Sequence, residues 1–326
     1  MTSASRINEI EVDANGESRR WSREPILVSV GSPQRLVKLI PTFERRPFTI
    51  AGSAASENKF LDLIVRLPMD PAETETPVAT VSKRYKLVQH ADVFEKVCEA
   101  LKKASIDHDR VSGELTMSVY GSKMALTITL PKEFDFDPGD GHVLKLSFHS
   151  VNSVDGSCRL RIMLGWFRFI CGNGLVVGTA QLTQRFTHNE FLELPDLCGI
   201  LAAGLKSAED EKQCLARWLN LRIDENHLAE WTDGPLREEW SPLAAARVYL
   251  ICQTGHDGHF ARPSERASAH RKSMIQTLCV PGAPQKAKNA YHVSQALAWV
   301  VRSRNDLQDQ LEWMMMIPRL MKTLLS

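Results

Sequence analysis

The stretch that decides the fold is Glu114-Leu-Thr-Met-Ser-Val-Tyr120, followed by Gly121-Ser122 and by Lys123-Met-Ala-Leu-Thr-Ile-Thr-Leu130. Two runs rich in β-forming residues flank a glycine-containing pair, which predicts a β-hairpin with a type II′ turn. Residues 143–151 and 158–170 have the same character and predict a second pair of strands. The middle of the chain is therefore expected to form an antiparallel sheet.

Helical periodicity follows on either side of these strands. Residues 91–104 place apolar side chains on one stripe, which predicts a helix with Asp92 as its N-cap. A long helix is expected over 195–223, interrupted near Gly204. Further helices are predicted at 242–254, 289–302 and 307–325, the last one broken or kinked at Pro318. The predicted fold class is α+β, with a central antiparallel sheet and a helical C-terminal half.

Composition divides the chain into three parts. Residues 1–24 are polar and aperiodic, and they are predicted to be a disordered tail. Residues 25–76 contain short β-like runs between prolines and glycines, which indicates a small β-rich region. The main domain is expected over 77–326, with its sheet in 77–189 and its helices in 190–326.

Bulk properties are those of an ordinary globular protein. The 326 residues are 43% hydrophobic and 24% charged, with a net charge of +1. The first twenty residues lack the apolar core of a secretory signal, and no run reaches the roughly 18 apolar residues of a membrane span. The 7 cysteines are odd in number and loosely spaced, as expected for reduced thiols. A cytoplasmic protein without a membrane partner is predicted.

Charge is segregated along the chain. Residues 190–240 contain 12 acidic and 5 basic residues, whereas residues 141–189 contain 5 basic residues against Asp155 alone. Residues 262–304 contain 8 basic residues against Glu265 alone. Such blocks predict one acidic and one basic surface, and their complementarity suggests a homo-oligomer in which the basic face of one copy meets the acidic face of the next.

Alternation along 158–170 separates two faces of one strand. Leu160, Ile162 and Trp166 belong to the predicted core face, and Arg168 shares that parity, so a bulge or an early strand end is expected there. The other face combines arginines with Phe167 and Phe169, which suits phosphates and stacked bases. An alternative is a solvated strand face whose phenylalanines pack under a helix. The candidate nucleic-acid contacts are Lys145, Arg159, Arg161, Phe167, Arg168, Phe169, Arg185, Arg271, Lys272, Lys286 and Lys288.

The usual catalytic and cofactor motifs are absent from the sequence. It contains no phosphate-binding loop, no nucleophile elbow and no His-Glu-x-x-His helix, so no cofactor and no catalytic residue are predicted. Cys252, His256 and His259 are residue types that suit zinc, but their spacing matches no standard finger. We therefore predict no metal site there, and a binding protein is favoured over an enzyme.

Several segments resemble the phage/plasmid-like protein family, a domain of unknown function. They are 77–90 followed by Asp92-Val-Phe94, the turn Asn152-Ser-Val-Asp-Gly-Ser157, the segment Phe167-Arg-Phe-Ile-Cys-Gly-Asn-Gly-Leu175, and the helix that begins at Asn289. Two positions depart from the pattern: Val154 stands where a histidine is expected, and Gly172 where a serine is more usual. The resemblance implies a phage, plasmid or integrated element, and the missing histidine argues against catalysis.

The central motifs also have a simple physical interpretation. Asp155 and Gly156 allow a tight turn between two long strands, with the glycine at positive φ. Asn152 can cap that turn by bonding backbone amides, and Asn173 next to Gly174 can do the same at the far end. Turn architecture is the predicted role of these residues.

These observations lead to three hypotheses for function. The first is a nucleic-acid-binding protein of a mobile element that binds or anneals single-stranded DNA in recombination or replication. The second is a module that blocks or recruits a host protein through the acidic helices of 190–240. The third and least favoured is a metal-dependent nuclease.

Overall fold

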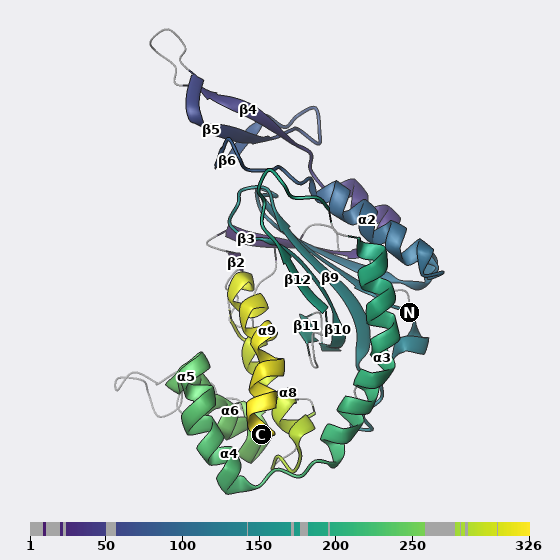
Figure 1. Cartoon of the computed structure of the whole chain (residues 1–326), viewed down its shortest axis with the longest axis vertical. Coiled ribbons are helices and arrows are strands. Elements are labelled where there is room, and N and C mark those ends of the chain that lie inside the picture. The colour runs from purple at the N-terminus through teal and green to yellow at the C-terminus, as the bar shows by residue number, and fades with distance from the viewer. Residues whose placement is uncertain are drawn as a thin grey trace.

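The computed structural model of the chain describes residues 9–10, 20–21, 24–49, 57–141, 143–170, 173–176, 182–194, 196–257, 278–280, 282–283, 286–304 and 306–326. It is a mixed α/β structure with a curled antiparallel sheet and helices in the C-terminal half, so the predicted fold class is confirmed. Figure 1 shows a small sheet at one end of the long axis and the helices α4, α5 and α6 at the other.

The large sheet is built from strands that pair in antiparallel fashion along the order β1-β3-β7-β8-β9-β10-β11, while β2 also pairs with β3 and β12 with β10. Its strands are β1 (Glu9–Ile10), β2 (Arg20–Trp21), β3 (Glu24–Gly31), β7 (Ser112–Ser118), β8 (Lys123–Thr129), β9 (Lys145–Ser153), β10 (Leu160–Ile170), β11 (Asn173–Val176) and β12 (Leu182–Phe186). Both predicted strand pairs are present.

The first hairpin has a longer loop than predicted. Because Met117 faces Met124, the connection is the four residues 119–122 and not a two-residue type II′ turn. Gly121 takes the positive φ of +72°, and its N–H donates to the carbonyl of Ser118 at 2.7 Å. A loop of this length is commonly built around a type I turn, which tolerates most residues before the glycine.

Two helices cover the core face of the sheet, α2 (His90–Lys103) and α3 (Leu197–Asn220) (Figure 1). The N-cap of α2 is Gln89 and not Asp92, because His90 is already helical and buried. Asp92 lies in the first turn, where its charge favours the helix N-terminus. The predicted interruption of the long helix is wrong, since α3 runs unbroken through a buried Gly204.

The C-terminal half contains the three further helices that the sequence predicts. They are α6 (Pro242–Thr254), α8 (Ala290–Arg302) and α9 (Leu307–Leu324), and α9 continues through Pro318 without a break. Elements that were not predicted precede α6, namely α4 (Glu225–Trp231), a π-helical turn (Thr232–Leu236) and α5 (Arg237–Trp240). The remaining short elements are α1 (Pro33–Leu36), η1 (Val37–Leu39), η2 (His108–Arg110), η3 (Lys132–Phe134), β13 (His256–Asp257) and β14 (Leu278–Cys279).

The small sheet consists of β4 (Phe43–Thr49), β5 (Glu57–Arg66) and β6 (Thr76–Ser82). Its carboxylate Asp62 is nearly buried and pairs with both Arg45 and Lys83 at 2.5 Å. The division of the chain differs from the proposed boundary at 76/77, because β3 belongs to the large sheet while β6 belongs to the small one. Which sheet a strand joins depends on its pairing with distant segments, and local composition does not predict that pairing.

The second face of the large sheet is also covered. Trp21 and Leu311 of α9 pack with Val151 and Met163 in a separate apolar cluster. Trp21 is fully buried although it lies in the stretch assigned to a polar tail, and β1 and β2 of that stretch pair with β3. In the part of the chain that the structure describes, no helix has the length and apolar character needed to cross a lipid bilayer.

Candidate functional site

A buried polar cluster joins the segments that the sequence singled out. Asn152, at 0% exposure, donates through Nδ2 to the Val88 carbonyl at 3.0 Å and to His90 Nδ1 at 2.9 Å. His90 Nε2 in turn lies 2.9 Å from the Gly121 carbonyl and donates to it, so the ring is neutral with its proton on Nε2. Burial lowers the pKa of His90 to about 4, which maintains that state at neutral pH.

The predicted role of Asn152 as a cap of the turn is therefore wrong, because its side chain reaches the start of α2. Asp155 caps the turn instead, since its Oδ1 accepts a hydrogen bond from the Ser157 N–H at 2.9 Å. Gly156 has φ +73°, as the turn requires. Val154, in place of the expected histidine, is fully buried with Phe43, Ile64 and Tyr85 in the apolar cluster that joins the two sheets.

Asp155 also carries the charge of this cluster. Its Oδ2 lies 3.3 Å from Nζ of Lys123, an ammonium with only 4% of its side chain exposed. Burial alone would raise the pKa of Asp155, but the hydrogen bonds from Ser157 and the charge of Lys123 hold it below its usual value. Lys123 was not predicted as a functional residue. Its place at the start of a strand that is otherwise free of charge is the signal that was available.

An aromatic pair closes the cluster. Tyr85 donates from its hydroxyl to the Ser153 carbonyl at 2.9 Å, and its ring stacks on His188 with centroids 5.2 Å apart. Burial, with Asp155 nearby, raises the pKa of Tyr85. Asn152, His90 and Tyr85 each donate to a backbone carbonyl of a segment distant in the chain, so this polar network holds β9, α2 and the turn at 154–157 in place.

Three predicted arginines meet at one end of β10, but not on an open ridge. Arg161 is 7% exposed and lies under α9, with Nη2 3.5 Å from Oε1 of Glu312. Its Nε and Nη1 are buried and have no hydrogen-bond partner within the part of the chain that the structure describes. Arg185 faces Arg161 across the β10–β12 ladder, is exposed, and donates to Sδ of Met315 at 3.4 Å. Arg159, just before β10, is exposed. We call Arg159, Arg161 and Arg185 the arginine cluster.

The other predicted contacts lie elsewhere. Lys145 is opposite Phe167 in the β9–β10 ladder. Phe167 lies six residues after Arg161 on β10, so Lys145 is about 20 Å from the arginine cluster. The expected bulge at Arg168 is wrong, because pairing with β11 continues in register to Ile170. Arg271 and Lys272 lie outside the described parts of the structure. Only the backbone is described for Phe167, Arg168, Phe169, Asn173 and Gly174.

Lys286 and Lys288 lie exposed just before α8. Lys286 pairs with Glu225 of the acidic segment at 2.5 Å. Part of the charge complementarity that suggested self-assembly is therefore satisfied within one chain. Two other basic residues of the 262–304 segment also have local partners, since Arg302 lies over the Trp299 ring and Arg304 pairs with Asp309.

The zinc-like residues do not form a metal site in the described residues, where no group of three or more metal-binding side chains is found. His256 donates from Nδ1 to the Thr254 carbonyl at 2.7 Å, and burial raises the pKa of Cys252 to about 12. That thiol is therefore protonated at neutral pH. His259 lies outside the described residues.

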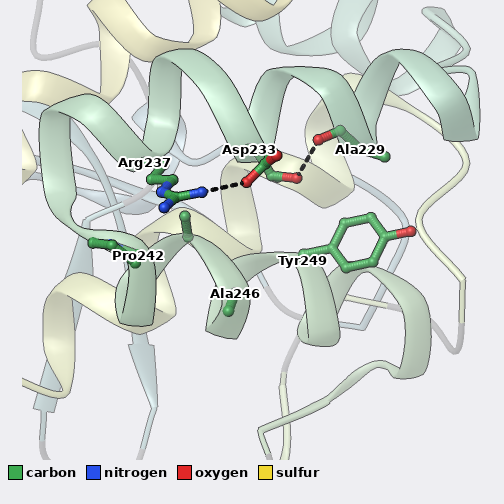
Figure 2. Close-up of a pocket in the computed structure, with 8 residues that line it drawn as sticks. Ala229, Asp233, Arg237, Pro242, Ala246 and Tyr249 are labelled. Atoms are coloured by element: carbon green, nitrogen blue, oxygen red, sulfur yellow. Dashed lines mark hydrogen bonds and ion pairs between the residues drawn. The ribbon is translucent and has the colours of Figure 1, made fainter.

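A pocket of about 330 Å³ opens between the π-helical turn and α6 (Figure 2). Asp233 and Arg237 form an ion pair on one wall, and Pro242, Ala246 and Tyr249 lie on the other. This pocket was not predicted. The available signal was the helix-breaking pair Gly234-Pro235 before the apolar run of α6.

Comparison with known proteins identifies a family but no individual related protein. A family model described as "Domain of unknown function (DUF932)" matches residues 77–242. No curated protein and no solved structure matches the chain. The matched range holds Tyr85, His90, Asn152, Asp155 and His188, so the buried polar cluster lies wholly within the family domain. The chain belongs to the DUF932 family.

Proposed function

We propose that this protein binds single-stranded nucleic acid, with the arginine cluster at the end of β10 as a contact for the phosphate backbone. The state of Arg161 carries the proposal. Its guanidinium is almost completely buried, two of its three nitrogens lack a hydrogen-bond partner among the described residues, and one carboxylate oxygen lies 3.5 Å away. A buried guanidinium whose one anionic contact is long can gain from a second anion, and phosphate oxygens accept strong charge-assisted hydrogen bonds from guanidinium.

The neighbours of Arg161 support the same ligand. Arg159 immediately precedes β10, two residues before Arg161 in the chain, and its side chain is exposed. Arg185 is directly opposite Arg161 on β12. Both are exposed, so a chain of phosphates can reach them from solvent while Arg161 lies deeper. Like charges placed this close repel one another, and a polyanion relieves that repulsion.

Glu312 of α9 acts as a local competitor. Its carboxylate is half exposed and is the acidic partner that Arg161 has in the described structure. The contact is long and solvated on one side, so it stabilises the guanidinium weakly. A phosphate that takes its place brings a stronger charge-assisted hydrogen bond.

The mobile-element setting is part of the proposal and has a different basis. The motif segments around Asn152 and Gly172 resemble a phage/plasmid-like family, and proteins of such elements serve replication, recombination or counter-defence. Annealing of single strands is the activity that combines this setting with a phosphate-binding cluster.

The test is binding of a labelled oligothymidylate, measured by fluorescence anisotropy across a salt series, with duplex DNA and RNA as comparisons. We expect binding to weaken steeply with salt, and Arg159→Ala and Arg185→Ala each to reduce the salt slope by about one. Arg217→Ala, on the exposed side of α3, removes the same charge elsewhere and should leave the slope unchanged. Absence of binding, or equal slopes in all three variants, would overturn the proposal.

A further inference from the structure

The pocket beside α6 has an apolar floor that extends onto the protein surface. Pro242, Ala246 and Tyr249 line it from α6, and Leu243 of the same helix is 63% exposed. The sequence of α6 contains a single charged residue, Arg247, which turns inward to form a bidentate pair with the buried Asp257. An exposed helix face without charge is typical of an interaction site.

Unusual backbone flanks this pocket on both sides. The wall that carries Asp233 is a π-helical turn with Pro235 inside it. Ser241, which begins α6, has φ +140° and ψ +159°, a region that non-glycine residues rarely adopt. Both features are frequent at functional sites.

The rim of the pocket is acidic. Asp233 lines the opening and pairs with the lining cation Arg237 at 2.9 Å, while the exposed Glu230 and Glu238 are adjacent in sequence to the lining residues Ala229 and Arg237. Other acids of this region are neutralised within the chain, since Glu225 pairs with Lys286 and Glu239 with Arg319. Between Ala229 and Glu238 three acidic side chains therefore stand against the one cation Arg237, which favours a cationic ligand.

We infer that this pocket binds a basic peptide segment of a partner protein. An apolar side chain of the peptide inserts between the π-helical turn and Ala246, a second packs on Leu243, and lysine or arginine residues face Asp233 and its neighbours. A peptide fits better than a small molecule, because the exposed Leu243, one helical turn from the lining residue Ala246, offers a second apolar contact outside the pocket. The volume of about 330 Å³ accommodates one large apolar side chain and lies at the lower end for drug-sized ligands.

The experiment selects peptides that bind the full-length chain from a displayed random library. The affinity of the enriched sequences is then measured with synthetic peptides by calorimetry. We expect the enriched sequences to combine apolar anchors with lysine or arginine. Ala246→Arg, which fills the pocket from an exposed position, should weaken their binding at least about tenfold, or roughly 1.4 kcal/mol. Ala203→Arg, the same change on the exposed face of α3, should not.

Charge is tested separately. Asp233→Asn keeps the shape of the wall, and we expect it to weaken binding several-fold at low salt and less at high salt. Failure to enrich any peptide, enrichment of acidic peptides, or equal binding to Ala246→Arg and the wild type would each overturn the inference. Oligothymidylate binding should be the same in Ala246→Arg as in the wild type, so this result is independent of the nucleic-acid proposal.

Discussion

Asn152 and His90 are joined by a hydrogen bond of 2.9 Å from Nδ2 to Nδ1, which ties β9 to the first turn of α2. Both side chains are completely buried. The same amide nitrogen of Asn152 also donates to the Val88 carbonyl, so one side chain satisfies two acceptors at the point where the small sheet leads into the main domain. The family domain is therefore held together here by polar contacts rather than by apolar packing alone.

Replacing Asn152 with alanine leaves both acceptors without a donor. Because an unpaired buried acceptor costs about 1–3 kcal/mol, we expect Asn152→Ala to lower the free energy of unfolding by about 3 kcal/mol. Urea denaturation followed by circular dichroism measures this change. Asn220→Ala, which removes an exposed hydrogen bond at the end of α3, should cost less than about 1 kcal/mol. An equal decrease in the free energy of unfolding in the two variants would show that the buried contacts of Asn152 stabilise the fold no more than an exposed hydrogen bond does.

Stability should also depend on pH through His90. Its pKa is about 4 in the folded chain against 6.5 for an ordinary histidine, so between these values the unfolded chain binds the additional proton. The free energy of unfolding therefore falls as pH decreases from 6.5 toward 4, by about 1.4 kcal/mol per pH unit for this one residue. Denaturation at several pH values measures the slope. In His90→Gln the slope should correspond to one bound proton fewer. An unchanged slope would contradict the conclusion that His90 is neutral in the folded chain.

Gly121 is predicted to resist substitution for two reasons. Its φ is +72°, and a Cβ added there would lie 2.8 Å from Cγ of Pro41. Gly139 has the similar φ of +78° with nothing within 4 Å of its added Cβ. We expect Gly139→Ala to cost about 1 kcal/mol from backbone strain and Gly121→Ala to cost more, because the clash adds to that strain. Thermal melts of the two variants test this, and equal midpoints would exclude a contribution from the contact with Pro41.

Glu312→Gln should increase nucleic-acid affinity if the arginine cluster binds phosphate. The change removes the carboxylate that contacts Arg161 and keeps the shape of the side chain. We expect oligothymidylate to bind about fivefold more tightly at low salt, or roughly 1 kcal/mol. Glu95→Gln, an exposed acid on α2, provides the matched change in net charge. A gain of the same size in both variants would indicate a general charge effect and no competition at Arg161.

Parts of the polar site were visible in the sequence, but their partners were not. Asp155-Gly156 was identified as a turn, and the structure shows the carboxylate capping it and the glycine at positive φ. Asn152 was singled out with the wrong role, because its partner His90 is 62 residues away along the chain. Hydrogen bonds between segments this far apart depend on how the strands assemble, and no local pattern encodes them.

What the sequence determined by itself was the period of each element and its buried side. Leu160, Ile162, Leu164 and Trp166 are all 0–1% exposed, as their alternation predicts, because side-chain direction in a strand follows from backbone geometry within a few residues. What only the tertiary structure decided was the fate of the opposite face. Arg161 lies there under α9, whose Glu312 is 151 residues away, so a surface that appears open in the strand pattern is covered in the folded chain. Covering a sheet requires the packing of a distant segment, and that depends on the whole arrangement of helices and strands.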